Sequence, residues 1–399
     1  MQLDPQHVLP SDVDRATLIG RAWVPAPSGA AGQGGPSPIL IDRSTVWDLS
    51  RVFPTVSELL NQVEPARVAR HAVTSGWSKS MGDINALIDN SHADRRDPAL
   101  PYLLSPCDLQ AIRACGVTFV SSMVERVIEE HAKGDPAKAE NIRTSIGAEI
   151  GAGIGSVKPG SPEAARLKDS LIQRQLWSQY LEVGIGPDAE VFNKAQPLSA
   201  VGVGSEIGIR ADSSWNNPEP EVVLAVNRAG NVVGAALGND VNLRDFEGRS
   251  ALLLGKAKDN NASCAIGPFI RLFDRHYGIA ELRRTHIRVE VRGTDGYHLT
   301  GESHLENISR DPLDLAAQAV NRSHQYPDGT MLFLGTQFSP VKDRDEAGKG
   351  FTHKLGDVVT IRADALGALV NRVNHCDKVT PWTFGIADLM RNLASRELL

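Results

Sequence analysis

The first hundred residues combine short apolar runs with polar, loop-forming segments. Strand-like apolar runs occupy residues 16–24 and 39–48, and the Pro/Gly/Ser-rich segment 25–38 between them predicts a surface loop. The segment "TVSELLNQV" predicts a short helix, whereas residues 84–100 are polar and predict irregular structure. We therefore expect residues 1–105 to form a small α+β domain.

The rest of the chain, residues 106–399, begins with helical patterns and continues with short strands. In "CGVTFVSSMVERVIEEHAKG" apolar residues recur at helical spacing and Gly134 ends the pattern, and Ser161 is the predicted N-cap of a second helix. Short apolar runs broken by Gly, Pro, Asn and Asp then follow Val183: "AVGVGSEIGIR", "EVVLAVN", "NVVGAALG", "HIRVEVRG", "TMLFLGT" and "DVVTIRA". Such closely spaced strands predict an α+β, mainly β fold with a barrel or rolled sheet.

Composition and charge exclude several classes of partner. The net charge of −6 gives no basic surface for nucleic acid, and no apolar run is long enough to span a membrane. The N-terminus lacks the layout of a secretory signal, and the four cysteines are dispersed without a CxxC motif. We therefore expect a cytoplasmic protein with reduced thiols.

Carboxylates stand beside two of the most apolar runs. Glu219 and Glu221 are two residues apart at the start of a predicted strand, so their side chains point to one face, and Asp240 ends the next strand. If the two strands are antiparallel neighbours, the three carboxylates meet at one end. Such a cluster suits a hard cation, Mg²⁺ or alternatively Mn²⁺, although an isolated E-x-E at a strand end is commonly solvated surface.

Two further residues have both a functional and an ordinary interpretation. Lys258 could neutralise negative charge developing on a metal-bound oxygen, but a lysine can equally end a helix. The Thr336 hydroxyl could bind a ligand carboxylate or merely cap a turn.

Taken together, these motifs resemble the fumarylacetoacetate hydrolase superfamily. The family pattern "E-x-E … ND-V-x-x-RD" is matched from Glu219 to "NDVNLRD", and a Gly-Thr strand end is matched by Gly335 and Thr336. A lysine ten residues before a Gly-Pro pair, an arginine after the ND pair and an "F-x-K" motif are matched by Lys258, Arg244, and Phe192 with Lys194. The resemblance implies a fumarylacetoacetate hydrolase-like fold in which Glu219, Glu221 and Asp240 hold the metal.

The chain departs from the hydrolases of this family at the residues that activate water. Their "G-x-N-Y-x-x-H-x-x-E" helix start reads "GVTFVSSMVE" here, so Thr118 replaces the asparagine, Ser122 replaces the histidine, and Glu125 remains. Glu247 and Asn261 stand where the family often has glutamine and aspartate. An unaided serine is no general base at neutral pH, so hydrolysis of a C–C bond is not favoured.

Nearly the whole chain instead resembles the 2-keto-3-deoxy-pentonate dehydratases of the superfamily. This resemblance implies a 2-keto-3-deoxy acid as small-molecule substrate and loss of its C4 hydroxyl to give 2,5-dioxopentanoate. It implies a homodimer or dimer-based oligomer, catalysis by Glu125, Lys258 and Ser122, and substrate contacts from five further positions. Those contact residues are Thr118, Arg244, Glu247, Asn261 and Thr336.

Three activities remain to be distinguished. The dehydratase is preferred over a metal-dependent C–C hydrolase or decarboxylase of diketo acids on the same site, and over a non-catalytic metal-binding protein. Within the dehydratase, either Glu125 or Lys258 could take the C3 proton. We prefer Glu125 as base or leaving-group acid and Lys258 as the group that stabilises negative charge.

Overall fold

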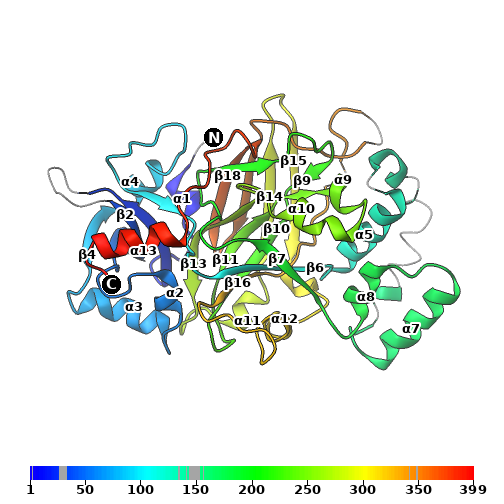
Figure 1. Ribbon diagram of the computed structural model, residues 1–399, viewed down its shortest axis with the longest axis horizontal. Helices are drawn as coiled ribbons and strands as arrows, with labels where there is room; N and C mark the ends of the chain where they lie inside the picture. Colours follow the sequence, from blue (N-terminus) through cyan, green and yellow to red (C-terminus); the bar gives the residue numbers. More distant parts are fainter. Residues whose placement is uncertain are drawn as a thin grey trace.

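The computed structural model describes residues 1, 3–26, 34–133, 135–140, 142, 153–155, 157–340, 342–346 and 349–399. Within these residues the chain forms two large sheets, a two-stranded ribbon and peripheral helices (Figure 1). This α+β architecture on large sheets confirms the predicted fold class. None of the described helices has the length and apolar character needed to cross a membrane.

The larger sheet has eleven strands in the order β4-β3-β2-β1-β13-β11-β10-β16-β6-β7, with β5 paired to β1. All of its neighbours are antiparallel except the parallel pair of β6 and β16. Its strands are β1 (Leu18–Val24), β2 (Gly35–Asp42), β3 (Thr45–Asp48), β4 (Lys79–Asp83), β5 (Tyr102–Leu104), β6 (Ala111–Gly116), β7 (Glu190–Ala195), β10 (Pro220–Val226), β11 (Val232–Asp240), β13 (Cys264–Leu272) and β16 (Thr330–Phe333).

The smaller sheet has five strands in the order β15-β14-β17-β18-β8. Its strands are β8 (Glu206–Ile209), β14 (His286–Arg292), β15 (His298–His304), β17 (Val358–Ala363) and β18 (Gly367–His375). The ribbon pairs β9 (Asn216–Asn217) with β12 (Asn242–Leu243).

Helices surround the sheets at both ends of the molecule. They are α1 (Pro5–Val8), α2 (Val56–Leu60), α3 (Pro65–Thr74), α4 (Ile84–Asp89), α5 (Val120–Ala132), α7 (Pro162–Gln173), α8 (Gln179–Ile185), α9 (Arg244–Glu247), α10 (Leu254–Lys258), α11 (Ile279–Leu282), α12 (Pro312–Ala319) and α13 (Ile386–Ser395), with short 3₁₀ turns at Ala251–Leu253 and Leu305–Asn307. The C-terminal α13 lies across the N-terminal elements, and α5, α7 and α8 lie at the opposite end (Figure 1).

The core explains why "EVVLAVN" is apolar at every position instead of alternating. Val222 and Leu224 of β10 pack in a cluster with Val289 of β14 and Leu369 of β18, between the two sheets. Val223, the residue between them, belongs to a second cluster on the other face of the large sheet, beneath α2 and α3. A strand buried on both faces needs apolar side chains in both directions.

Several expectations for the N-terminal part are corrected by the structure. The predicted strand 39–48 is two strands, because the chain reverses at Arg43, whose φ is +56°. The predicted loop 25–38 is shortened, since β2 already begins at Gly35; residues 27–33 of that loop lie outside the described residues, as does Gly134. The segment 84–100 starts with α4 and is therefore not irregular throughout.

The N-terminal strands and the later strands form one continuous sheet. β1 pairs with β13 through Leu18 and Ile19, opposite Arg271 and Ile270. Hydrogen bonding therefore crosses the expected boundary near residue 105, and the division into two domains stays a prediction.

Candidate active site and metal centre

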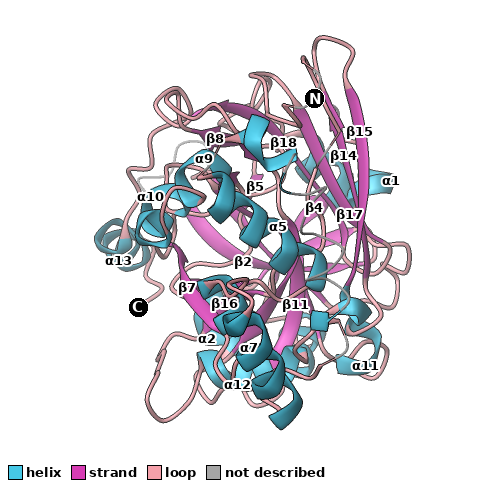
Figure 2. Cartoon of the chain, turned by 90° about the vertical axis from the view of Figure 1, so that its right-hand side faces the viewer, coloured by secondary structure: helices cyan, strands magenta, loops and turns pink. Residues whose placement is uncertain are grey.

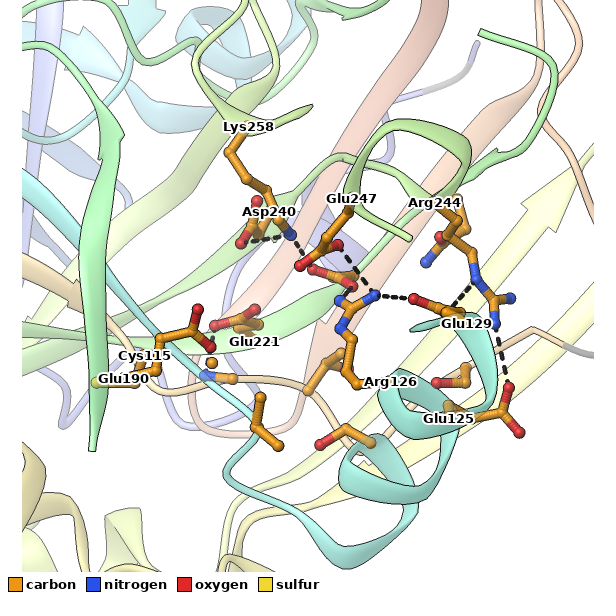
Figure 3. A pocket seen from close by; sticks show the side chains of 18 of the residues that line it. Cys115, Glu125, Arg126, Glu129, Glu190, Glu221, Asp240, Arg244, Glu247 and Lys258 are labelled. Carbon is orange, nitrogen blue, oxygen red and sulfur yellow. Dashed lines mark hydrogen bonds and ion pairs between the residues drawn. The ribbon is translucent and has the colours of Figure 1, made fainter. Parts of the chain in front are cut away.

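Three carboxylates meet where β10 begins and β11 ends. The antiparallel register places Glu221 opposite Gly238, so Glu219 and Glu221 come close to Asp240. All three side chains are buried, and one oxygen from each lies within 4.8 Å of the others. Figure 3 shows two of them, Glu221 and Asp240. The three residues therefore cluster at one end of the sheet, as the sequence predicts.

Buried ammonium groups balance much of this negative charge. Lys258, the last residue of α10, places its Nζ 2.5 Å from Glu219 Oε2 and 3.1 Å from Asp240 Oδ2. Lys194 of β7 reaches Asp240 Oδ1 at 2.9 Å and donates to the Lys258 carbonyl at 2.6 Å. Although burial opposes ionisation, the two lysines keep the pKa of Asp240 below its ordinary value.

Glu221 receives less compensation than its neighbours. Burial raises its pKa well above the ordinary value, and the nearby Asp240 and Glu219 carboxylates raise it further. The backbone N–H of Gly335 donates a hydrogen bond to Glu221 Oε2 at 2.6 Å. A positive charge at this position would therefore relieve an electrostatic penalty that the described residues leave in place.

Gly335 needs to be glycine to make this contact. Its φ is +88°, and a Cβ atom there would lie 2.1 Å from the Thr118 hydroxyl. Thr118 donates to the Leu334 carbonyl at 2.6 Å and so fixes the loop after β16. The Thr336 hydroxyl accepts from Phe338 N at 3.0 Å, which is the turn-capping alternative, while its side chain still lines the cavity.

Helix α5 lies near α9 and α10 (Figure 2), and several of its side chains line the cavity. Its Arg126 reaches into the acidic cluster: one guanidinium nitrogen lies 2.6 Å from Glu219 Oε1, and the other lies 2.7 Å from Glu129 Oε2 and 3.0 Å from Glu247 Oε2. Although burial opposes it, these carboxylates raise the pKa of Arg126 well above the ordinary value. Arg126 thus connects α5 to the predicted metal ligands.

Charged side chains form a row that runs from the carboxylate cluster along α5, and Glu125 lies at its far end (Figure 3). Its Oε2 is 3.1 Å from Arg244 Nη2, and Arg244 Nε is 2.6 Å from Glu129 Oε1. Arg244 also stacks over Trp215, with 4.3 Å from its guanidinium carbon to the ring centroid. Glu129, one helical turn beyond Glu125, therefore lies closer along the row to the carboxylate cluster.

Ser122 forms a helix cap. Its hydroxyl donates to the Phe119 carbonyl at 2.8 Å and accepts from the Phe119 N–H at 3.2 Å, which stabilises the first turn of α5. Ser122 lines the cavity, but both of these hydrogen bonds are to the Phe119 backbone and give no geometric support to the predicted catalytic role.

Glu190 is a cavity-lining carboxylate that the sequence reasoning missed. It is the first residue of β7 and lines the cavity. Its carboxylate packs so closely against Gly116 that a Cβ atom added there would overlap with it. Among the described residues no ion pair of Glu190 is found. Burial, followed by repulsion from Glu247, raises its pKa to about 7.

The cavity unites most, but not all, of the residues predicted from sequence. Asn261 lies elsewhere and donates to the Cys376 carbonyl at 3.1 Å, and Thr118 supports the Gly335 loop from behind. The predicted residues that line the cavity are Ser122, Glu125, Glu219, Glu221, Asp240, Arg244, Glu247, Lys258 and Thr336.

The residues missed from sequence are Arg126, Glu129 and Glu190. A helical projection of α5 could have found Glu129, because Ser122, Glu125 and Glu129 follow the i, i+3, i+7 spacing of one face. Arg126, at the i+4 position from Ser122, belongs to the same face, whereas no local pattern marks Glu190 as a cavity residue.

Comparison with known proteins agrees with this geometry. A 2-dehydro-3-deoxy-D-arabinonate dehydratase of Saccharolobus solfataricus is 31% identical over 191 residues, which are 48% of this chain and 60% of that protein. A probable 2-keto-3-deoxyxylonate dehydratase of Haloferax volcanii is 30% identical over 194 residues, 49% of this chain and 63% of that protein. Each alignment therefore covers less than two thirds of the relative's length.

The fold extends the similarity further along the chain. A solved structure described as 2-keto-3-deoxy-D-arabinonate dehydratase complexed with magnesium and 2,5-dioxopentanoate superposes with a TM-score of 0.59. It covers 90% of this chain and 99% of the other at 19% identity, which is evidence for a shared fold. Residues 185–374 match the family described as fumarylacetoacetate (FAA) hydrolase C-terminal, so this part of the chain is similar to that family.

Proposed function

We propose that this protein is a magnesium-dependent dehydratase that converts a 2-keto-3-deoxy-pentonate to 2,5-dioxopentanoate. The observation that carries the proposal is the buried cluster of Glu219, Glu221 and Asp240, with Lys258 bonded to two of its members. The names of both curated relatives, and the product named for the similar solved structure, support this substrate class.

The donor set fits a hard divalent cation. All three side chains offer carboxylate oxygens, which Mg²⁺ prefers and Mn²⁺ accepts, and the raised pKa of Glu221 reflects negative charge in excess of its neutralisation. Glu219, Glu221 and Asp240 would hold the ion, with Glu219 and Asp240 exchanging part of their contact with Lys258 and Arg126. When bound, Mg²⁺ would supply Lewis-acid polarisation of the substrate's 2-keto group.

Lys258 is suited to stabilise negative charge on the substrate. Although burial favours the neutral amine, Asp240 and Glu219 outweigh it and raise the pKa of Lys258 above the ordinary value. The ammonium therefore stays protonated at neutral pH and is a poor base. Its fixed position beside the carboxylates allows it to face the C2 oxygen as negative charge develops there.

Two proton movements are needed from carboxyl groups of the chain. One group takes a C3 proton, and one gives a proton to the C4 hydroxyl as that hydroxyl leaves as water. The resulting 5-hydroxy-3-enone then tautomerises, losing a proton at C5 and gaining one at C3, and the enol so formed ketonises to 2,5-dioxopentanoate. Glu190, whose pKa is raised to about 7 by burial, is close to evenly protonated at neutral pH and is our first choice for the C3 base. Glu125 on α5, which Arg244 positions, is the candidate for leaving-group acid. Glu129 is unsuited to that role, because Arg126 and Arg244 keep its pKa below the ordinary value although burial opposes them.

The remaining polar residues of the cavity would bind the substrate. Thr336 and Glu247 line it, and Arg126 lies between Glu219 and Glu247, where it can meet a substrate carboxylate or hydroxyl. Closing the site with α5 would exclude water, which favours elimination over hydrolysis. We also propose a homodimer as the simplest assembly.

The direct test is incubation of the full chain with 2-keto-3-deoxy-xylonate and, separately, 2-keto-3-deoxy-arabinonate in Mg²⁺. We expect a product lighter by one water that retains all five carbons and reacts as an aldehyde, and we expect no product in chelator. A shorter carbon chain would instead indicate a C–C hydrolase or decarboxylase. The proposal would be refuted if neither acid were turned over.

A further inference from the structure

A second cluster of side chains of metal-ligating types lies on the small sheet, away from the carboxylate cavity. His286 begins β14 and His304 ends β15, and the antiparallel register places them directly opposite each other. Glu302 is two residues before His304, so its side chain points to the same face of the sheet. Ligand atoms of the three residues all lie within 4.8 Å of one another.

The distances within this cluster differ from those of an ordinary ion pair. Glu302 Oε2 is 3.4 Å from His286 Nε2 and also 3.4 Å from His304 Nε2. Both separations exceed the usual length of an N–H···O hydrogen bond, about 2.7–3.2 Å. One carboxylate oxygen is therefore equally distant from two imidazole nitrogens and forms a short hydrogen bond with neither.

The same pair of strands supplies a matched comparison. His298 of β15 and Glu290 of β14 approach to 2.6 Å, the length of a strong hydrogen bond. A histidine and a glutamate on these strands can thus pair closely, even though Glu290 also bonds Arg292. Within the described part of the chain, the ion pairs of Glu302 are to His286 and His304 alone.

The spacing matches the edges of a tetrahedral metal site. With bonds of about 2.0–2.1 Å from metal to nitrogen or oxygen, neighbouring ligands of a tetrahedral ion are separated by about 3.3–3.4 Å. The two distances to Glu302 already have this value. The imidazole rings are stacked with centroids 4.0 Å apart, so a modest rotation of the rings would turn both nitrogens toward one point.

Accessibility also favours a ligand. His286 Nε2 is buried and has no hydrogen-bond partner, which is costly for a polar nitrogen unless something binds it. The side chains of Glu302 and His304 are 58% and 37% exposed, so an ion can enter from solvent and keep a water ligand.

We propose that His286, Glu302 and His304 form a second metal site, for a borderline divalent transition cation of which Zn²⁺ is the probe. Two imidazoles and one carboxylate are ligands that Zn²⁺ favours, whereas Mg²⁺ prefers oxygen ligands alone. The site is therefore chemically distinct from the carboxylate cluster, and the inference does not depend on the proposed dehydratase activity.

The site also touches the loop that borders the active cavity. The Ser303 hydroxyl, between Glu302 and His304, accepts from Gln337 N at 3.2 Å, and His304 N donates to the Gln337 side chain at 3.1 Å. Gln337 directly follows Thr336, which lines the cavity. Cation binding at the strand end would hold this loop and raise thermal stability.

The test is equilibrium dialysis of the full chain against Zn²⁺, with Mg²⁺ in large excess to occupy the carboxylate cluster. The wild type should bind one more equivalent of Zn²⁺ than His286→Ala/His304→Ala, while His298→Ala should match the wild type. Any Zn²⁺ bound at the carboxylate cluster cancels in this comparison, because all variants keep that cluster.

Glu302→Gln provides a second, milder variant that changes one exposed side chain. It should weaken Zn²⁺ binding at least as much as loss of an outer-sphere partner does, about 10- to 100-fold. Unchanged stoichiometry and affinity in both the double variant and Glu302→Gln would overturn the proposal, as would an equal loss of Zn²⁺ in His298→Ala.

Discussion

Replacing Lys258 with methionine separates the charge balance of the site from its chemistry. The substitution keeps most of the side-chain volume but removes the Nζ that lies 2.5 Å from Glu219 and 3.1 Å from Asp240. Lys258 is almost fully buried, so water cannot replace the lost charge. Removing one partner of a buried ion pair costs about 3–5 kcal/mol of folding free energy.

The loss of stability should depend on magnesium. In chelator the Glu219 and Asp240 carboxylates keep Arg126 and Lys194 as cationic partners and the Asn242 amide as a neutral one, and we expect the full destabilisation. At a Mg²⁺ concentration of 100 times its Kd, binding would return ~2.7 kcal/mol, so the midpoint of unfolding should recover substantially.

Turnover should not recover with stability. If Lys258 stabilises charge on the C2 oxygen, its loss should lower kcat by about 10²–10³-fold even in saturating Mg²⁺. The assay measures the aldehyde product and the denaturant midpoint of the same preparations. Lys256→Met, the same change at an exposed position on the same helix, is the control and should alter neither quantity appreciably.

Equal turnover of Lys258→Met and Lys256→Met in Mg²⁺ would refute the assigned role. Loss of turnover in parallel with unfolding, at every Mg²⁺ concentration, would show that Lys258 is required only for structure.

The remaining predictions concern the other carboxylates and the cap. Glu221→Gln should abolish Mg²⁺-dependent thermal stabilisation together with turnover, and retention of either by this variant would remove Glu221 from the ligand set. Glu190→Gln should lower kcat and remove the rise in activity through about pH 7 expected of a base that works ionised; an unchanged pH profile would exclude that assignment. In chelator, wild-type stability should fall as pH rises from the unfolded carboxyl pKa towards 7, because the folded state binds the Glu190 proton more tightly, so Glu190→Gln should be the more stable protein at pH 8 in urea melts. Ser122→Ala should cost about 1 kcal/mol through the lost cap and retain most turnover, whereas Glu125→Gln should be much less active; the reverse order would contradict the α5 assignment. Light scattering at micromolar concentration should give a dimer mass, and a monomer mass would reject the proposed assembly.

The sequence alone was sufficient to predict the carboxylate cluster. Glu219, Glu221 and Asp240 lie on two strands joined by a short turn, and their pairing follows from chain connectivity. Side-chain alternation then sets which residues share a face. The apolar runs on both sides of the carboxylates indicated burial, which the structure confirms.

The same local reasoning was weaker for residues whose polar group can either bind a ligand or form a hydrogen bond within the fold. Ser122 and Thr336 were candidate functional hydroxyls, and both form local hydrogen bonds to the backbone. A sequence shows that a hydroxyl is present but not which acceptor or donor it meets. Asn261 is a similar case, because its partner, the Cys376 carbonyl, is 115 residues away.

Only the tertiary structure decided what surrounds the carboxylates. Arg126 meets Glu219 across 93 residues of chain, and Glu190 enters the cavity because β7 pairs with β6 at the edge of the large sheet. Likewise, β1 joins β13 across more than two hundred residues, which makes one sheet out of two expected domains. Periodicity records which face of an element is buried, but the partner that buries it is chosen by the packing of the whole chain.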